Sequence, residues 1–323
     1  MRAAIYDRNG PAREVLRVAD VPTPEPGPGE VRVRLHRSGV NPTDWKSRGG
    51  ATARPIEGFQ IPNQDGAGIV DAVGEGVDRT RIGERVWVWL AAAGRRWGTA
   101  AEHTAVPAEQ AVRLPDSASM ELGASLGVPA MTAHRCLFAD GPLDGRVVLV
   151  AGGAGAVGHF AIELAKWGGA RVVATVSTDE KATLAHAAGA DLVVRYTDAD
   201  AAERIRAFAP RMDRIVEVNI RDNLQLDLGV SGPGTVISVY AADGPDPVLP
   251  VRACMSANVV LRFLLLYGVP RPDLLQAARD ITAALDAGAL SELPGRHFAL
   301  DDIAAAHDAV EQRAVGKVFV DLD

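Results

Sequence analysis

The sequence predicts an α/β protein in which a β-rich domain is joined to a domain with a doubly wound parallel sheet. Three observations lead to this prediction. The chain has 323 residues, which is long for one hydrophobic core and suits two domains. The first 120 or so residues show the alternation of half-buried strands. From about Pro115 onward, short β-branched runs alternate with alanine-rich helical stretches, as in parallel sheets with crossover helices.

Strand patterns in the first domain are separated by glycine and aspartate turns. Val31, Val33 and Leu35 alternate with charged residues, which predicts a strand with one buried face. The stretch 21–30, VPTPEPGPGE, is rich in proline and cannot form regular structure, so we expect a surface loop there. The strands expected in this domain are 30–40, 67–77 and 84–90.

The second domain alternates strand and helix patterns. The expected strands are 146–152, 171–176, 191–196, 213–218, 234–240 and 259–266. The expected helices are 156–169, 178–190, 198–209 and 271–290, and a helix or loop follows 213–218. Because short connections link these elements, a parallel sheet follows. The last residues, 316–323, form a lone strand that we expect to pair with the first domain.

Composition and charge exclude several classes of protein. The formal net charge of −7 argues against a general binder of nucleic acid or anionic membranes. The two cysteines, Cys136 and Cys254, lie far apart and give no disulfide framework. The N-terminus lacks the apolar region of a secretory signal, and apolar runs such as 259–266 are too short to span a bilayer. We therefore expect a cytoplasmic protein.

A glycine-rich loop is the strongest functional signal. Residues 151–158, AGGAGAVG, follow a predicted strand and open a predicted amphipathic helix. Gly153, Gly155 and Gly158 match the G-x-G-x-x-G pattern, in which the missing side chains let the backbone approach a pyrophosphate. The helix N-terminus then offers free N–H groups to the phosphates. The alternative is a tight turn that holds no ligand.

The end of the next predicted strand indicates which dinucleotide binds. A site for NAD usually has Asp or Glu there, to bind the ribose 2′-hydroxyl. This chain has Ser177 and Thr178, which do not repel a 2′-phosphate, and Lys181 follows within one helical turn. Tyr196, at the end of the third strand, adds a hydroxyl. These residues favour NADPH.

Two alternatives remain open at this strand end. Ser177 and Glu180 have the spacing of a helix capping box, which would make Lys181 a surface residue. Asp179 and Glu180 lie just beyond the key position and keep NADH open as the cofactor.

Other catalytic chemistries have weak support in the sequence. The seven histidines form no H-x-x-H or H-x-x-x-H pair, and no C-x-x-C is present, so we expect no metal site. Gly123, Ser125 and Gly127 match the G-x-S-x-G elbow of serine hydrolases. That motif needs a strand before the serine, whereas PDSASMEL before it indicates a helix start.

Five stretches together resemble one family over nearly the whole chain. They are RLHRSGVNPTDWKSRGG, PNQDGAGIVDAVGEGVDRTRIGERVW, LGVPAMTAHRCL, AGGAGAVG and GKVFVDL. Their order is similar to that of the medium-chain dehydrogenase/reductase superfamily, and within it to the zinc-free NADPH:quinone oxidoreductases of the zeta-crystallin group. The resemblance implies a GroES-like catalytic domain at 1–122, completed by 290–323, and a Rossmann domain at 123–289.

The resemblance also implies that catalytic zinc is lost. Zinc-dependent members carry a cysteine in the segment where this chain has Asn41, and Gly-His-Glu where it has Asn63-Gln64-Asp65. A four-cysteine lobe that is common in those members is absent here as well.

The resemblance further implies the residues that bind the cofactor and substrate. The implied cofactor-binding residues are Ala154, Gly155, Ala156, Val157, Ser177, Lys181, Tyr196, Asn223, Tyr240, Ala241, Leu264, Leu265 and Leu266. Asn41, Lys46 and Thr132 are the implied catalytic residues beside the nicotinamide. Lys46 stands where relatives often have tyrosine, and Tyr240 where many have a small residue, so the substrate is open. Surface exposure of Lys46 and a loop-holding role for Asn41 are the alternatives.

The expected activity is NADPH-dependent hydride transfer to a quinone or a similar electron-poor conjugated carbonyl. One alternative is reduction of the C=C bond of an enone or enoyl thioester. Another is an NADPH-binding protein with a structural or RNA-regulatory role, against which the net charge argues. The resemblance implies a homodimer or homotetramer formed by edge pairing of Rossmann sheets.

Overall fold

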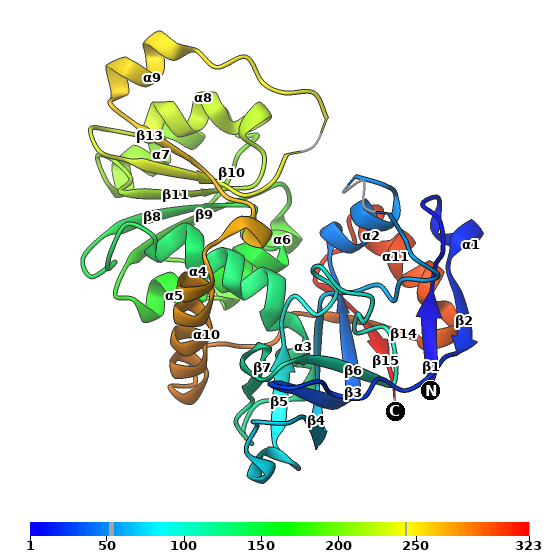
Figure 1. The fold of residues 1–323 in the computed structure, drawn as a ribbon. Coiled ribbons are helices and arrows are strands. Elements are labelled where there is room, and N and C mark those ends of the chain that lie inside the picture. The colour runs from blue at the N-terminus through cyan, green and yellow to red at the C-terminus, as the bar shows by residue number, and fades with distance from the viewer. Residues whose placement is uncertain (52–54, 243, 323) are drawn as a thin grey trace. The chain divides into compact units, whose positions relative to one another are not determined.

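The structure is a computed structural model, which describes residues 1–51, 55–242 and 244–322 (Figure 1). The chain forms two compact units: unit 1 is Met1–Val128 with Glu292–Asp323, and unit 2 is Pro129–Ser291. The first predicted boundary, after residue 122, lies six residues before the observed one. The helix α3 (Met120–Ser125) packs on strands of unit 1, which places its residues in that unit.

Unit 1 is built on a seven-stranded sheet. Its order is β14 (Gly295–Ala299), β15 (Lys317–Asp321), β3 (Glu30–Val40), β4 (Asp65–Val73), β5 (Arg85–Val88) and β7 (Ala111–Arg113), and β6 (His103–Pro107) also pairs with β3. A separate hairpin-like pair is formed by β1 (Arg2–Ile5) and β2 (Arg17–Asp20). The C-terminal strand β15 pairs antiparallel with β3, which confirms the expected return of the tail to the first domain.

The predicted buried face of β3 is confirmed. Val31, Val33 and Leu35 are buried and pack with Val70 and Val86 of the neighbouring strands. The proline-rich stretch before β3 contains no helix or strand, as expected. The helices of unit 1 are α1 (Ala12–Val15), α2 (Pro42–Arg48), α3 and α11 (Ile303–Glu311), and α2 packs against α11.

Unit 2 is a doubly wound α/β domain, as predicted. Its parallel sheet has the order β10 (Leu192–Arg195), β9 (Arg171–Val176), β8 (Val147–Ala151), β11 (Arg214–Glu217), β12 (Val236–Val239) and β13 (Val260–Phe263). The helices are α4 (Met131–Phe138), α5 (Ala156–Trp167), α6 (Asp179–Ala187), α7 (Ala201–Phe208), α8 (Ile220–Val230), α9 (Val251–Ala257) and α10 (Arg271–Asp286). Figure 1 shows α7 and α8 on one side of the sheet and α4, α5 and α10 on the other.

The winding of unit 2 reverses between two central strands. The chain runs from β8 outward to β9 and β10, and then crosses to β11 and continues to β12 and β13. Ligands of such sheets bind at the carboxyl ends of the strands beside this reversal. The segment 220–230, which the sequence left as helix or loop, is the helix α8.

Two other sequence questions are settled by local structure. Ser125 lies inside α3, and its hydroxyl donates a hydrogen bond to the carbonyl of Leu122 at 2.7 Å, so the serine-hydrolase alternative is wrong. Ser119 caps α3 by accepting the amide of Leu122, as the PDSASMEL pattern predicts. Among the described residues, no helix has the length and apolar character needed to cross a bilayer.

Candidate functional site

The glycine loop of unit 2 joins β8 to α5 with close backbone packing. Gly152 has a φ of +70°, which favours glycine. A Cβ on Gly158 would lie 2.2 Å from the carbonyl oxygen of Gly152, and one on Gly153 would lie 2.9 Å from the Cβ of Ala174. Three glycines of the loop are therefore required by the turn and by the helix–strand packing.

Gly155 is different, because nothing in the part of unit 2 that the structure describes requires glycine there. It precedes α5 with φ −81° and ψ 163°, which any residue adopts, and an added Cβ would have only an ordinary contact, 3.5 Å from the Gly152 oxygen. The first bond along the helix runs from the His159 amide to the Gly155 carbonyl at 2.8 Å, so the amides of the first turn are available as donors. An open glycine beside free amides fits a bound pyrophosphate.

The end of β9 brings two predicted cofactor residues together. The ammonium of Lys181 donates a hydrogen bond to the Ser177 hydroxyl at 3.0 Å. Thr178, not Ser177, is the N-cap of α6, since its hydroxyl accepts the amide of Lys181 at 3.3 Å. The capping-box alternative for Ser177 is therefore wrong. Asp179, one of the two acids that keep NADH open, is 3.5 Å from the guanidinium of Arg195.

Tyr196 lies on the neighbouring strand end. Its amide bonds the carbonyl of Val176 at 3.1 Å, and its side chain is 44% exposed. The hydroxyl is thus free to approach a ligand that lies over Ser177 and Lys181.

Five further predicted cofactor residues follow the carboxyl ends of β12 and β13. Tyr240, followed by Ala241, comes directly after β12, and its amide bonds the Glu217 carbonyl at 3.1 Å. The amide of Leu264, after β13, bonds the Val239 carbonyl at 2.8 Å. Leu265 is exposed, whereas Leu266 is buried.

Asn223, on α8, bonds Glu217, a residue that the sequence did not single out. Its side-chain nitrogen donates to both carboxyl oxygens of Glu217, at 2.9 and 3.2 Å. Glu217 ends β11 and is fully buried. The available signal was an acid at the end of a predicted apolar strand.

Unit 1 contains a buried cluster of charged groups around Asn41. The Asn41 backbone amide donates to Asp44 at 2.7 Å, and its side-chain nitrogen donates to Asp65 at 2.6 Å. The ammonium of Lys317 donates to the Asn41 side-chain oxygen at 2.6 Å and lies 3.8 Å from Asp65. The other Asp65 oxygen accepts the amide of Val128 at 2.8 Å. We call Asn41, Asp44, Asp65 and Lys317 the buried cluster.

The buried cluster shows how the side chain of Asn41 is used. Its side-chain oxygen and nitrogen are both used within unit 1, and the residue is 2% exposed. These contacts are those of a positioning residue. Lys46 lies on the same helix, α2, with its ammonium 5.7 Å from the centre of the Trp45 ring. Thr132 is buried on α4 and belongs to unit 2. The role of these three residues in catalysis stays a prediction.

Burial and mutual repulsion control the protonation of the cluster. Burial, followed by the charge of Asp65, raises the pKa of Asp44 to about 8. Burial also raises the pKa of Asp65 to about 6, although Lys317 and Asn41 oppose the shift. Burial lowers the pKa of Lys317 while the two carboxylates oppose that shift. Near neutral pH the cluster therefore holds one proton on Asp44 and an ion pair between Asp65 and Lys317.

The free energy of unfolding of unit 1 is expected to fall as the pH rises from about 4 to about 8. Folded Asp44 keeps its proton up to about pH 8, whereas the unfolded chain releases it near pH 4. In this window the folded state binds more protons, so rising pH favours unfolding. The variant Asp44→Asn cannot titrate there and is expected to show a flatter slope in urea unfolding at a series of pH values. Equal slopes in the two proteins would contradict the assignment.

The cluster and its neighbours do not fit a catalytic zinc. Neither Asn41 nor Gln64 supplies the thiolate or imidazole that zinc prefers, and Gln64 accepts the amide of Ala92 at 3.1 Å. Asp65 is a carboxylate, but the ammonium of Lys317 lies beside it. Asn63, with φ +71°, is held by hydrogen bonds to Ser38 and His307, both at 3.0 Å. Amides and an ammonium thus occupy the place of metal ligands.

Comparisons with known proteins agree with this architecture. The alcohol dehydrogenase GroES-like domain family matches residues 27–116, and the zinc-binding dehydrogenase family matches residues 156–283. A quinone oxidoreductase from Pseudomonas aeruginosa is 31% identical, covering 93% of each chain. A 2-haloacrylate reductase from a Burkholderia species is 30% identical, covering 95% of this chain and 94% of its own. A mycobacterial protein solved in complex with NADPH has a TM-score of 0.85 at 30% identity, covering 99% of this chain and 100% of its own. The chain thus belongs to the medium-chain dehydrogenase/reductase superfamily, as an oxidoreductase similar to the quinone oxidoreductases.

Proposed function

We propose that this protein is a zinc-independent reductase that transfers hydride from NADPH to a quinone or a similar electron-poor conjugated carbonyl. The observation that carries the proposal is Gly155, whose lack of a side chain serves no packing need within unit 2. The backbone amides of Ala154, Ala156 and Val157 would hold the pyrophosphate, while the Gly155 amide closes the loop on the Gly152 carbonyl at 3.0 Å. The nicotinamide supplies the hydride when bound. The NADPH complex of the mycobacterial relative supports this assignment.

NADPH is proposed over NADH because of the strand end at Ser177. The Ser177 hydroxyl and the Lys181 ammonium lie 3.0 Å apart there. Tyr196 directly follows β10, the strand next to β9, and its side chain is exposed. A 2′-phosphate would accept hydrogen bonds from these groups, and the lysine would balance its charge.

Lys181→Ala is expected to weaken NADPH binding by roughly 10- to 100-fold, because a charge-assisted hydrogen bond to phosphate is lost. NADH binding is expected to change by less than about twofold, since NADH has no phosphate at this position. Titration of cofactor fluorescence measures both constants. Lys166→Ala is the matched control, because Lys166 pairs with Asp191 at 2.8 Å on the surface of unit 2. Equal weakening of NADPH and NADH would contradict the 2′-phosphate assignment.

The acceptor is proposed from the chemistry that the chain offers. A quinone spreads the developing negative charge over its ring and carbonyls, so the hydride step needs no strong acid from the protein. Lys46 and Thr132 are the proposed donors to that charge, and Asn41 is proposed to shape the site through its fixed amide. Oxidation of NADPH by a panel of quinones and conjugated enones tests this. No turnover with any of them would overturn the proposal.

A second candidate acceptor is the C=C bond of a conjugated acid or thioester. The 2-haloacrylate reductase among the relatives favours it. Comparing kcat/KM for quinones with kcat/KM for acrylates and enoyl thioesters separates the two candidates.

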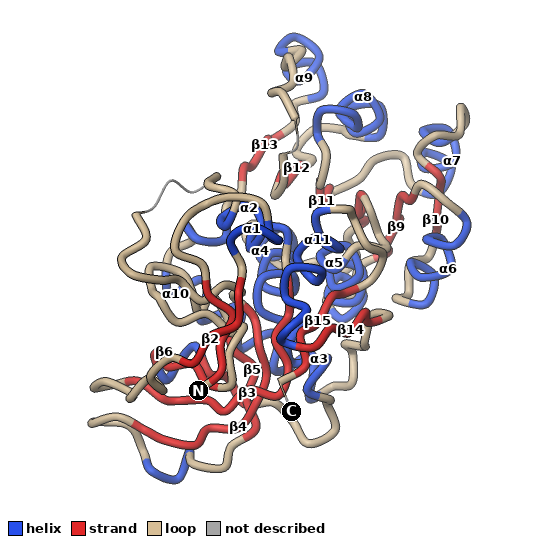
Figure 2. Tube along the Cα trace, turned by 90° about the vertical axis from the view of Figure 1, so that its right-hand side faces the viewer, coloured by secondary structure: helices blue, strands red, loops and turns tan. Residues whose placement is uncertain are grey.

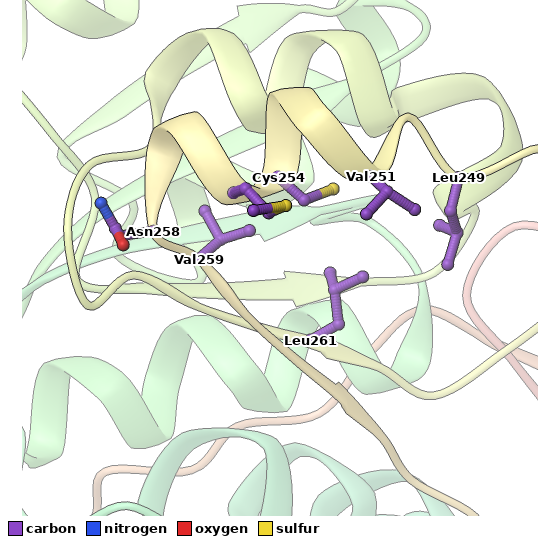
Figure 3. A pocket seen from close by; sticks show the side chains of 7 residues that line it. Leu249, Val251, Cys254, Asn258, Val259 and Leu261 are labelled. Atoms are coloured by element: carbon purple, nitrogen blue, oxygen red, sulfur yellow. The ribbon is translucent and has the colours of Figure 1, made fainter.

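We propose further that the protein forms a homodimer through the edge of the unit 2 sheet. Among the described residues, β13 pairs on one side with β12, and its other edge is open. Exposed apolar side chains lie along this edge and on α9. Figure 2 shows α9 beyond β12 and β13. These side chains are Val251, Met255, Val260, Phe263 and Leu265. A surface pocket of about 400 Å³ lies beside them, and Figure 3 shows its lining. Open strand edges and apolar patches mark interfaces.

Replacing Val260 and Phe263 together with lysine is expected to convert a dimer into a monomer, because two charges would enter the paired edge. Light scattering after size-exclusion chromatography measures the mass. Ile82→Lys is the control, since Ile82 is similarly exposed but lies in unit 1. A wild-type monomer, or a double variant that stays dimeric, would contradict the assembly.

A further inference from the structure

The end of β11 forms one side of the point where the sheet of unit 2 reverses its winding. β11 pairs with β8, whose end leads into the glycine loop. Val218, directly after β11, lies against that loop, because a Cβ on Gly152 would be 3.2 Å from a methyl of Val218. The geometry of residues 217–219 is therefore coupled to the backbone that is proposed to bind the pyrophosphate.

A buried carboxylate fixes this turn. Glu217 is fully buried, and its oxygens accept the backbone amide of Asn219 and the side-chain nitrogen of Asn223. The two donors come from the turn and from the first part of α8, so one carboxylate ties both to the end of β11. Asn223 is one of the residues expected to contact the cofactor.

A second carboxyl group faces the first one. Asp227, one helical turn beyond Asn223 on α8, is 1% exposed, and neither of its oxygens has a hydrogen-bond donor among the described residues. The neighbouring group is the carboxyl of Glu217, also an acceptor, whose negative charge acts on Asp227. Two buried acceptors can bond only if one carries a proton. The other donors all bond Glu217, which places the proton on Asp227 and the charge on Glu217.

The protonation of the two groups agrees with this geometry. Burial, and then the charge of Glu217, raises the pKa of Asp227 well above its usual value. Burial also raises the pKa of Glu217, while its hydrogen bonds to Asn219, Asn223 and Asp227 lower it. Glu217 is therefore the group that ionises first.

We propose that protonated Asp227 and ionised Glu217 act as a positioning pair that holds Asn223 and the 217–219 turn in the form that binds the nicotinamide cofactor. The proposal rests on the proposed cofactor site. Loss of the shared proton places two charges side by side in a buried space, which forces the pair apart and releases Asn223. Cofactor affinity then falls at alkaline pH.

Other charged groups on the surrounding elements bond elsewhere. Arg206 of α7 donates to the carbonyl of Gly229 at 2.9 Å, and Arg221 of α8 pairs with Asp222 at 2.9 Å. Tyr240, after β12, is a titratable group that feels the charge of Glu217. The burial that raises the pKa of the Tyr240 phenol keeps it neutral over the alkaline range of the test.

The test is the dissociation constant of NADPH measured by fluorescence between about pH 7 and pH 9.5. Wild-type affinity is expected to fall by about tenfold or more across this range, since a hydrogen bond to a charged group is lost. Asp227→Asn supplies a permanent donor to Glu217 and is expected to change by less than about twofold over the same range. Glu203→Gln, an exposed carboxylate on α7, is expected to follow the wild type.

Two results would overturn the positioning pair: a flat wild-type profile, or an Asp227→Asn profile that falls as the wild type does. If Asp227→Asn does not fold, the NADPH affinity of Glu217→Gln tests the positioning pair instead. This variant is expected to weaken NADPH about tenfold at pH 7 and to show no alkaline fall, because Asn219 and Asn223 lose their charged acceptor; unchanged affinity would overturn the pair. If wild-type protein binds neither NADPH nor NADH at any pH, the proposed function fails instead.

Discussion

Lys317→Met is expected to lower the free energy of unfolding of unit 1 by about 3 to 5 kcal/mol, because it leaves a buried carboxylate without its counter-charge. The ammonium of Lys317 is 2% exposed, contacts Asn41 and lies 3.8 Å from Asp65, which is fully buried. Urea unfolding at neutral pH measures the loss.

Lys166→Met provides the control for this variant. Lys166 also pairs with an aspartate, but both side chains of that pair are about one-third exposed, and such pairs contribute about 1 kcal/mol or less. Combining Lys317→Met with Asp65→Asn removes both charges and is expected to cost less than the sum of the two single changes. A loss for Lys317→Met no larger than that for Lys166→Met would show that the buried cluster is not an ionic one.

Gly158→Ala is expected to abolish cofactor binding and to destabilise unit 2 by several kcal/mol. The added Cβ would lie 2.2 Å from the carbonyl oxygen of Gly152, and the backbone of the loop or of α5 must move to relieve the clash. Thermal unfolding and cofactor titration measure the two effects.

Gly155→Ala separates folding from binding in the same loop. Its Cβ would lie 3.5 Å from the nearest atom, the Gly152 oxygen, so stability is expected to change by less than about 1 kcal/mol. Cofactor affinity is nevertheless expected to fall, because the side chain enters the proposed pyrophosphate space. Gly155→Ala protein with unchanged cofactor affinity would contradict the reason given for this glycine.

The fold could be predicted because its signals are local. The alternation at Val31, Val33 and Leu35 identifies a half-buried strand from neighbouring residues alone. The glycine loop, its strand and its helix lie within about two dozen residues, so their order predicts the βαβ unit. The Ser177–Lys181 contact could be predicted from the sequence for the same reason, since the two residues lie one helical turn apart.

The buried cluster could not be predicted from the sequence, because its members meet only in the tertiary structure. Lys317 lies 276 positions from Asn41, and no spacing rule connects a C-terminal strand to the start of α2. The family resemblance implies that Asn41 lies beside the nicotinamide, whereas its side-chain amide bonds two buried charged groups, Asp65 and Lys317. Glu217 lies near the end of an expected strand, and Asp227 lies in the segment that the sequence left as helix or loop, so no spacing rule pairs the two acids.

NADPH-dependent quinone reduction is tested by the rate of nicotinamide oxidation by the purified wild-type protein, with NADPH or NADH as donor and a 1,4-quinone as acceptor. We expect turnover with kcat/KM at least about tenfold higher for NADPH than for NADH, since the Ser177–Lys181 pair is proposed to bind the 2′-phosphate. A preference for NADH, or bound NADPH that is oxidised by neither quinones nor conjugated enones, would contradict the proposal.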